Sequence, residues 1–313
     1  MEFFSHSTSI NFMAQRKGAM ILSIILFVAS IGALLVNGLN WGLDFTGGTQ
    51  VQVSYQDKAD LDNIHQRLDV AGFKDAVVIS YGTSKDVLIS LVPKGKVTTE
   101  GAEAKAAQDT LVSQVMSALP GAKLEAVSYV GPQVGQEMAS RGLLAVIVAL
   151  LGTMVYIAFR FDFRFAIGST IALIHDPVII MGIFALFHIE FNLIALAAVL
   201  TVIGYSLNDT IVIYDRVREN FRKLRKVDAI EVMNLSINQT LSRTIMTSLL
   251  TLVVVMALYF IAGSLLHGFS VALMVGIIVG TYSSIYVAGS LTILLGLQRD
   301  HLIPQMKAVD ERP

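Results

Sequence analysis

The strongest pattern along the chain is a series of long, nearly uncharged apolar runs separated by polar stretches. A helix needs about 20 apolar residues to cross a bilayer, and six of the runs satisfy this length. They cover Gly18–Val36, Gly142–Phe159, Phe165–Phe187, Phe191–Ile213, Thr244–Leu266 and Gly268–Leu297. The last run is longer than a bilayer requires, so we expect it to tilt or to extend past the surface. The pattern predicts an α-helical integral membrane protein with six transmembrane helices.

The polar region between the first two runs has the pattern of a small α+β domain. Thr49–Tyr55 alternates apolar and polar residues like a half-buried strand, and Asp60–Ala71 has apolar residues at helical spacing. The other predicted elements are strands at Ala76–Tyr81 and Asp86–Val92 joined by a hairpin at Gly82–Lys85, a helix at Glu100–Leu119 and a strand at Lys123–Val130. The order βαββαβ predicts a ferredoxin-like fold. Nothing in this region converges on catalytic chemistry, since its only histidine, His65, lies on a predicted exposed helix face.

The distribution of basic residues predicts the orientation of the helices. Lys and Arg are concentrated at one end of the runs, whereas His188–Glu190 and the surroundings of His267 have neither. The basic residues concerned are Arg16, Lys17, Arg160, Arg164, Arg216, Arg218, Arg222, Lys223, Arg225, Lys226, Arg299 and Lys307. Because basic loops remain in the cytoplasm, both termini are predicted to be cytoplasmic and the α+β domain periplasmic.

These observations divide the chain into five parts. They are a cytoplasmic N-terminus (1–17), transmembrane helix 1 (18–37), a periplasmic ferredoxin-like domain (38–138), transmembrane helices 2–6 (139–298) and a cytoplasmic tail (299–313). The first apolar run lacks an A-x-A cleavage site before Asn37–Trp41, so we interpret it as an uncleaved signal anchor. The expected location is the inner membrane of a bacterium.

Composition agrees with a membrane protein and excludes several functional classes. Only 15% of the residues are charged, against about 25% in average soluble domains. The net charge of −1 argues against a nucleic-acid-binding protein. The absence of cysteine excludes disulfides, thiolate metal sites and a cysteine nucleophile. With no hydrolase constellation either, we predict neither an enzyme nor a protein with a metal or organic cofactor.

Asp209 is the residue that most directly suggests a function. It lies in an otherwise uncharged run, within Gly204–Thr210, where small and polar residues surround it. A carboxylate at such a depth costs about 2.5–3.5 kcal/mol on insertion scales, and such residues usually mark ion or proton pathways. Arg243, near the start of the next run, is its candidate partner. The alternatives are a purely structural ion pair and, for Arg243, snorkelling to the membrane surface.

His175-Asp176-Pro177, near the middle of the third run, is a second polar candidate. Pro177 frees a backbone carbonyl one turn earlier and kinks the helix. The His175–Asp176 pair is therefore either a proton relay or a polar hinge that satisfies the interrupted backbone. Asn208, next to Asp209, belongs to the same set of candidate membrane residues.

Three further segments have structural interpretations. Asp44, Gly47 and Gly48 belong to the link between the first helix and the first strand. The link lacks the G-x-x-x-x-G-K-[ST] pattern of a phosphate loop, so we predict a tight connection between the membrane and the outside domain. Asp215–Lys226 is interpreted as a cytoplasmic loop that mainly reflects the positive-inside rule, with a docking surface as the alternative. Gly276–Gly280 is a GxxxG pattern and marks close helix packing, either within the chain or with a partner.

Several motifs together resemble the SecF family, the smaller subunits of the SecD–SecF accessory complex of the bacterial Sec protein translocase. The motifs are Asn40–Thr49, Tyr129–Gly135, His175-Asp176, Gly204–Asp209, Asp215–Arg222 and Gln239–Thr244, and they span nearly the whole chain. The resemblance implies a membrane protein of the RND superfamily type with SecD as its partner. It also implies work on exported polypeptides beside the SecYEG channel and the SecA ATPase, driven by the proton-motive force. The family's membrane acid and arginine correspond to Asp209 and Arg243.

Three function classes compete on the residues alone. They are a proton-driven motor that assists protein export, half of an RND-type exporter of small molecules or lipids, and a non-transporting scaffold of the translocon. The intramembrane Asp209 and Arg243 argue against a scaffold, and the resemblance favours the motor over the exporter. We expect protons as the coupling ion, with sodium as the alternative, because a carboxylate in a polar cavity binds either.

Overall fold

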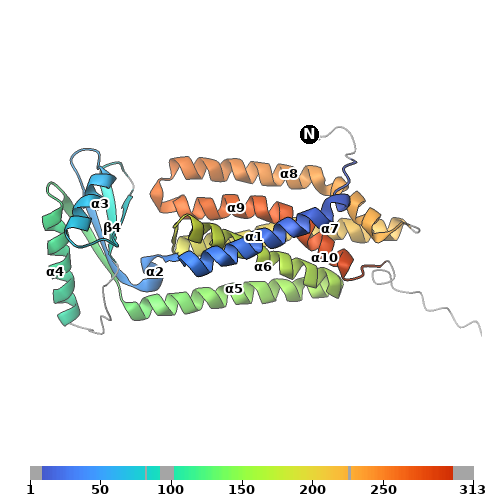
Figure 1. Ribbon diagram of the computed structural model, residues 1–313, viewed down its shortest axis with the longest axis horizontal. Coiled ribbons are helices and arrows are strands. Elements are labelled where there is room, and N and C mark those ends of the chain that lie inside the picture. The colour runs from blue at the N-terminus through green and yellow to red at the C-terminus, as the bar shows by residue number, and fades with distance from the viewer. Residues whose placement is uncertain (1–8, 82, 92–101, 225–226, 299–313) are drawn as a thin grey trace, which may run out of the picture.

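The computed structural model describes residues 9–81, 83–91, 102–224 and 227–298. Within them, six helical segments are long and apolar enough to cross a membrane, as the sequence predicts. Figure 1 shows these segments side by side, with a small α/β domain at one end. The start of the first segment and the end of the last lie at the opposite end. The spans are Met13–Asn37, Pro132–Arg160, Phe163–Leu186, Leu193–Lys223, Ala229–Ile261 and His267–Leu294.

The first span consists of a 3₁₀ turn, η1 (Met13–Gln15), and α1 (Arg16–Asn37), and the next four spans are single helices. These are α5 (Pro132–Arg160), α6 (Phe163–Leu186), α7 (Leu193–Lys223) and α8 (Ala229–Ile261). A short 3₁₀ turn, η2 (Ser264–Leu266), precedes the last span. That span is not a uniform helix: it consists of α9 (His267–Ser283), a π-helical segment η3 (Ser284–Ala288) and α10 (Gly289–Leu294).

Two of the helices extend well beyond the apolar runs. Helix α5 begins at Pro132, inside the predicted outside domain, and α7 continues to Lys223. The prediction of a loop from Asp215 is therefore wrong for the part of Asp215–Lys226 that the structure describes up to Lys223. The charged residues continue the helix because Glu219 pairs with Arg216 and Lys223 at helical spacing. Phe221 is also buried against the rest of the protein.

The α/β domain (residues 48–130) contains the predicted elements in the predicted order. They are β2 (Gly48–Ser54), α3 (Leu61–Val70), β3 (Val77–Ser80), β4 (Asp86–Leu91), α4 (Ala102–Ala118) and β5 (Lys123–Val130). The strands pair antiparallel in the order β3-β4-β2-β5. Val51 and Val53 are fully buried in a core that α3 and α4 complete, whereas Gln50 and Gln52 point to the other, uncovered face. Gly82, in the predicted hairpin, lies outside the described residues.

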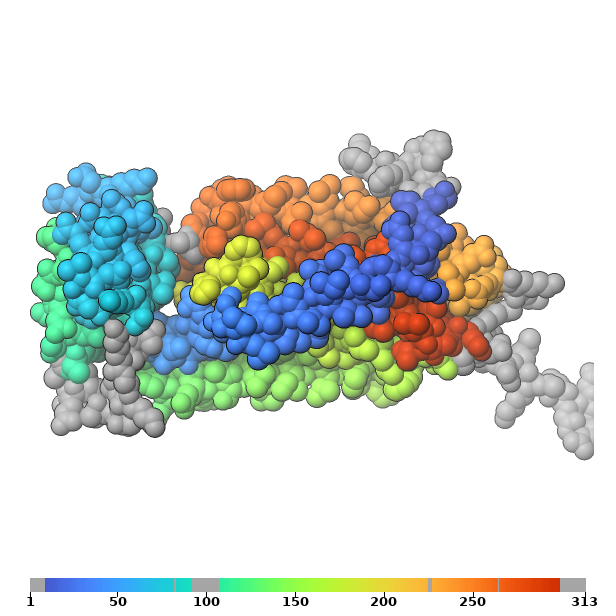
Figure 2. Space-filling model, in the orientation of Figure 1, coloured from blue at the N-terminus to red at the C-terminus, as the bar shows by residue number. Residues whose placement is uncertain are grey.

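The helices differ strongly in how much of their surface is buried. In the most apolar stretches of α6 and of the α9–α10 span, 61% and 56% of the residues are buried, against 11% for α1, α5 and α8. Helices α6, α7 and α9 therefore form the interior, and the apolar outer faces of the others suit contact with lipid or a partner. Figure 2 shows α1 crossing one face of the helices, with the α/β domain as a lobe at their end.

The GxxxG pattern lies at the α7–α9 contact, so the close packing occurs within the chain, which is one of the two predicted alternatives. A Cβ atom added at Gly276 would overlap the side chain of Val202, and one added at Gly280 would lie 3.0 Å from Cβ of Ser206. The two glycines thus let α9 approach α7 closely. This approach brings Ser206 of α7 next to the polar residues of α9.

Candidate functional site

A cluster of polar side chains lies in the interior formed by α6, α7 and α9. Its centre is Asp176 of α6, which is fully buried. One carboxylate oxygen of Asp176, Oδ2, accepts hydrogen bonds from Oγ of Ser206 at 2.7 Å and from Oγ of Ser283 at 2.9 Å. The other oxygen, Oδ1, lies 3.0 Å from Nδ1 of His175. Because a buried carboxylate is stable only when its oxygens are hydrogen-bonded, this arrangement explains how Asp176 is tolerated inside the protein.

The π-helical segment of the last span extends the cluster. Ser284, its first residue, donates to the backbone carbonyl of Ser206 at 3.1 Å, and its hydroxyl lies 2.8 Å from Oγ1 of Thr210. One turn further along α7, the hydroxyl of Tyr214 lies 3.0 Å from that of Thr292. Single π-helical turns are rare and are frequent at functional sites. At this junction two consecutive serines face different helices: Ser283 donates to Asp176 of α6, and Ser284 contacts α7.

Asp209 lies on α7, one helical turn from Ser206, and only 2% of its surface is exposed. Its carboxylate oxygen Oδ2 is buried and has no hydrogen-bond partner among the described residues. Asp209 therefore differs from Asp176, whose two carboxylate oxygens both have partners. A buried, incompletely satisfied carboxylate has a strong electrostatic preference for a proton or another cation.

Arg243 of α8 is close enough to Asp209 to interact electrostatically. Arg243 is exposed, however, and no ion pair within 4.0 Å joins it to Asp209 in the part of the chain that the structure describes. The structure thus places the predicted partners near each other without direct contact. Asn208 is also exposed on α7, so the structure does not bring it into the buried cluster with His175 and Asp176.

The link between α1 and the α/β domain is tied to the helices at several points. It includes a two-residue strand β1 (Asn40–Trp41), which pairs in parallel with β6 (Glu190–Phe191), and a short helix α2 (Leu43–Thr46). Asp44 accepts a hydrogen bond from the backbone amide of Leu193 at 2.9 Å. This contact satisfies an N–H group in the first turn of α7, where a carboxylate is also favoured by the helix dipole.

Gly47 and Gly48 complete this link in backbone conformations that favour glycine, with φ of +73° and +149°. A Cβ atom at Gly47 would lie 2.9 Å from Cα of Pro132, the first residue of α5. A Cβ atom at Gly48 would overlap the carbonyl oxygen of Leu91. The predicted tight connection is therefore present in the structure, and it has contacts to α5, α7 and the sheet.

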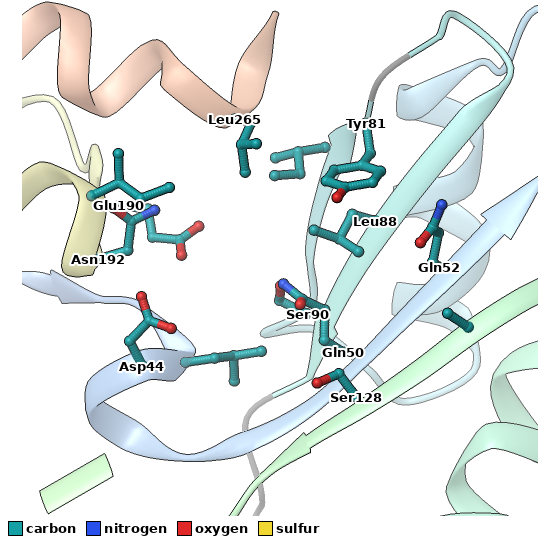
Figure 3. Close-up of a pocket in the computed structure, with 14 residues that line it drawn as sticks. Asp44, Gln50, Gln52, Tyr81, Leu88, Ser90, Ser128, Glu190, Asn192 and Leu265 are labelled. Atoms are coloured by element: carbon teal, nitrogen blue, oxygen red, sulfur yellow. The ribbon is translucent and has the colours of Figure 1, made fainter. Parts of the chain in front are cut away.

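A pocket of about 280 Å³ separates the uncovered face of the sheet from the end of the helices. In Figure 3, Gln50 and Ser90 of the sheet lie across from Asp44 and Glu190 of the helical side. Lys and Arg are absent from the described residues that line it. Burial raises the pKa of Glu190, and the nearby charge of Asp44 raises it further. Among the described residues, no group of three or more His, Cys, Asp or Glu side chains is arranged to hold a metal ion.

Sequence reasoning identified the acids and the polar segment around Asp209, but not the serines of the last span that contact this cluster. Ser283 and Ser284 lie within a long apolar run, where serine is a common residue and forms no periodic pattern. The available indication was the Gly276–Gly280 motif, because a close helix contact one turn before a pair of serines predicts that these serines meet the neighbouring helix. The β1–β6 pairing gave no local indication at all.

Comparison with known proteins connects this arrangement to protein export. The family described as "Protein export membrane protein SecD/SecF, C-terminal" matches residues 111–298, and the "SecD/SecF GG Motif" family matches residues 32–59. Protein translocase subunit SecF of Pseudomonas aeruginosa is 48% identical over 97% of this chain and 98% of its own length. The corresponding subunit of Vibrio alginolyticus is 45% identical over 95% of this chain and 93% of its own length.

Solved structures agree. The crystal structure of SecDF from Thermus thermophilus, a translocon-associated membrane protein, is similar with a TM-score of 0.78 and 37% identity. It covers 94% of this chain, and this chain spans 39% of the SecDF chain. A structure of SecDF in a super-membrane-facing form has a TM-score of 0.71 and 35% identity, with the same coverage of both chains. The chain therefore belongs to the SecF family of protein translocase subunits.

Proposed function

We propose that this chain works with SecD in Sec-dependent protein export and converts the proton-motive force into movement of its outer domain. The observation that carries the proposal is the state of Asp209, a buried carboxylate with an oxygen that has no hydrogen-bond partner among the described residues, near the cation of Arg243. Such a group gains or loses a proton with a large change in local electrostatics. Protons are thus the proposed coupling ion, with sodium as the alternative.

The architecture supports an incomplete transporter that a second chain completes. The chain corresponds to 39% of SecDF, whose remaining part SecD would supply. Six spans with one outside domain are half of a pseudo-symmetric transporter of the RND superfamily type. The exposure of Arg243 and Asn208 on α8 and α7 fits this proposal, because polar side chains within a membrane are covered by protein or water rather than by lipid.

The proposed orientation has the α/β domain in the periplasm and both termini in the cytoplasm of the bacterial inner membrane. The basic residues near the ends of the spans support it, as does the position of the α/β domain opposite the start of α1 and the end of α10 (Figure 1). The antiparallel strand order β3-β4-β2-β5, with the element order βαββαβ, supports a ferredoxin-like fold for this domain. In this position it would meet exported polypeptides as they leave the SecYEG channel.

The proposed mechanism begins with ionised Asp209, held by its electrostatic interaction with Arg243. A proton from the periplasm neutralises Asp209 and removes that interaction, and the packing of α7 changes. The contact between Asp44 and the backbone amide of Leu193 then transmits the change from α7 to the α/β domain. One charge crossing 100 mV releases about 2.3 kcal/mol, which shifts a two-state equilibrium by roughly fifty-fold.

The test is Asp209→Asn in cells that lack the native gene, with export of a secretory protein and co-purification of SecD as readouts. The matched control is Asp215→Asn on the same helix, where the acid is outside the buried cluster and pairs with Arg160 at 3.1 Å. We expect Asp209→Asn to abolish export support without loss of SecD, and the control to remain active. Arg243→Met is expected to have the same effect as Asp209→Asn.

Two outcomes would contradict the proposal. If export continues with Asp209→Asn, the acid is structural and a non-transporting scaffold of the translocon becomes the better explanation. If export is unaffected by loss of the gene while a small molecule or lipid accumulates in the cells, the chain belongs to an exporter of such compounds. The second result would also remove the reason to expect SecYEG as a neighbour.

A further inference from the structure

The His175–Asp176 pair contains a buried nitrogen atom that none of the contacts described so far uses. His175 is 5% exposed, and its ring nitrogen Nε2 has no hydrogen-bond partner among the described residues. The other ring nitrogen, Nδ1, faces the carboxylate of Asp176 at 3.0 Å. Burying an imidazole nitrogen without a hydrogen-bond partner costs free energy. Such an atom therefore suggests a second state of the site in which the nitrogen binds a proton.

The charge balance of the pair indicates what that state is. Ser206 and Ser283 both donate to Oδ2 of Asp176, so the proton shared within the pair lies between Oδ1 and Nδ1 of His175. With that single proton the pair has a net charge of −1 wherever the proton rests. A second proton makes the pair neutral, and Nε2 of His175 is the nitrogen left to receive it.

Among the described residues, no cation lies within ion-pair distance of Asp176 other than His175 itself. The only ion pair of Asp176 within the described part of the chain is the one with His175. On the helices packed against α6, Asp209 of α7 is itself an acid, and the hydroxyl of Tyr282 of α9 donates to the backbone of α1. The basic residues of these helices form no ion pair with Asp176 within 4.0 Å in the described part of the chain. An isolated buried negative charge is strongly disfavoured, and a proton on Nε2 removes it.

The alternative role as a hinge receives no support from the hydrogen bonds. Pro177 lies inside the continuous helix α6 and frees a backbone carbonyl one turn earlier. The side-chain hydrogen bonds of His175 and Asp176 go to each other and to serine hydroxyls, and none goes to that carbonyl. The pair is therefore not arranged to repair the interrupted backbone.

Protonation of His175 would change its contact with α1, the helix that leads into the α/β domain. The ring of Phe27 in α1 is nearly parallel to the imidazole, with an interplanar angle of 4° and a centroid distance of 6.2 Å. An aromatic face attracts an imidazolium more strongly than a neutral imidazole. Further outward, Asn37 at the end of α1 donates to the backbone carbonyl of Ala185 in α6. Asn40 of β1 donates to the backbone carbonyl of His188, which follows α6.

We propose that the His175–Asp176 pair is a second proton-binding site, distinct from Asp209, with Nε2 of His175 as the atom that gains and loses the proton. Ser206 and Ser283 position the carboxylate, and Phe27 links the loaded state to the packing of α1. The link to movement of the α/β domain rests on the proposed function, whereas the proton binding itself does not.

The first test observes the proton directly in the full chain bound to SecD. The six histidines are labelled with ¹⁵N, and the His175 signal is identified by its absence in His175→Asn. We expect the Nε2 signal to change between its unprotonated and its protonated position as the pH of the sample is varied. We expect Asp176→Asn, which removes the carboxylate that faces Nδ1, to abolish this change. A His175 ring with one protonation state at every pH at which the complex stays folded overturns the proposal.

The second test asks whether this proton is used. His175→Asn keeps a donor toward Asp176 and lacks the second nitrogen, whereas Phe27→Leu keeps an apolar contact and lacks the aromatic face. We expect loss of proton-dependent export with His175→Asn and partial loss with Phe27→Leu, while SecD still co-purifies. Normal export with His175→Asn, alongside loss with Asp209→Asn, overturns the role of this second site and leaves the proposed function intact. Normal export with Asp209→Asn contradicts the proposed function instead, and the ¹⁵N measurement still decides the proton binding.

Discussion

The α/β domain and the helical part of this protein place their polar residues in opposite ways. The α/β domain surrounds a conventional apolar core, and its buried polar residues are Thr49 and Ser90 among those the structure describes. The helical part buries His175, Asp176 and Asp209 in its interior and leaves its apolar faces outside. Water drives apolar burial only in the first case, because lipid chains are as apolar as the helices that they surround. The helices are therefore joined by close packing of small residues and by polar contacts.

The largest effect that would test this comparison is removal of core volume in the α/β domain. Ile89 of β4 is fully buried beneath the two helices. We expect Ile89→Ala to lower the free energy of unfolding of the domain by about 2–5 kcal/mol, through lost burial and the resulting cavity. Hydrogen exchange of β4 in the full chain measures this change. Val70→Ala is the control, since Val70 is 91% exposed, and it is expected to change stability by less than about 0.5 kcal/mol.

The boundary between the two parts is tested by Gly48→Ala. The new Cβ would overlap the backbone oxygen of Leu91 at a φ of +149°, so we expect a cost of about 1–3 kcal/mol from the clash and of similar size from backbone strain. Gly38→Ala is the matched control, because Gly38 has a φ of +67° and no atom within 4 Å. Gly38→Ala introduces backbone strain alone, whereas Gly48→Ala introduces both strain and a clash. We therefore expect the link to be more sensitive to protease in Gly48→Ala than in Gly38→Ala. Equal sensitivity would show that the close contact at Gly48 has no structural role.

Close packing within the helical part is tested by Gly276→Ala. The added methyl group would overlap the side chain of Val202 and push α9 from α7, at a cost of about 1–3 kcal/mol. Gly204→Ala on α7 adds the same methyl group where no atom lies within 4 Å. The melting temperature of the purified protein in detergent is expected to fall only for Gly276→Ala. A fall with both variants would mean that glycine flexibility, rather than the α7–α9 contact, controls stability.

The smallest effect concerns Glu190, an acid at the pocket between the two parts. Its pKa is raised by burial and by the charge of Asp44, so the folded state holds the proton to a higher pH than the unfolded state does. Stability contributed by this proton is present below the ordinary value of 4.5 and is lost as pH rises through the raised pKa.

Glu190→Gln cannot ionise and avoids this loss. Because Glu190 is only partly buried, we expect the variant to be slightly more stable than the wild type at pH 7. The difference should disappear below pH 4.5. Thermal unfolding at pH 4 and pH 7 measures it, and a variant that is less stable at pH 7 would contradict the assignment.

The sequence predicted features that depend on local pattern. Alternation in Thr49–Tyr55 and helical spacing in Asp60–Ala71 indicated β2 and α3 to within about two residues. Hydropathy found every span but ended α7 at Ile213, because it treats charged residues as the end of a helix even where their side chains pair along it. The sequence also identified the membrane acids and their approximate depth, because both follow from the position of each acid within its own apolar run.

Features that depend on distant residues were not predictable in this way. The β1–β6 pair joins Asn40 to Glu190, and no pattern in either segment identifies the other. The serines that hold Asp176 become neighbours only after α7 and α9 pack. Likewise, the sequence suggested Asp209 and Arg243 as partners. The exposure of Arg243 depends on how α8 is oriented about its axis when it packs, which the sequence does not show.

The link between α1 and the α/β domain has a mechanical consequence. A flexible tether transmits tension alone, since the body at its end is free to turn. This link is held by backbone pairing to β6, by the bond from Leu193 to Asp44 and by contact with Pro132. Anchors on three different elements restrict turning as well as stretching, so we expect a rotation of α7 to transmit torque to the α/β domain.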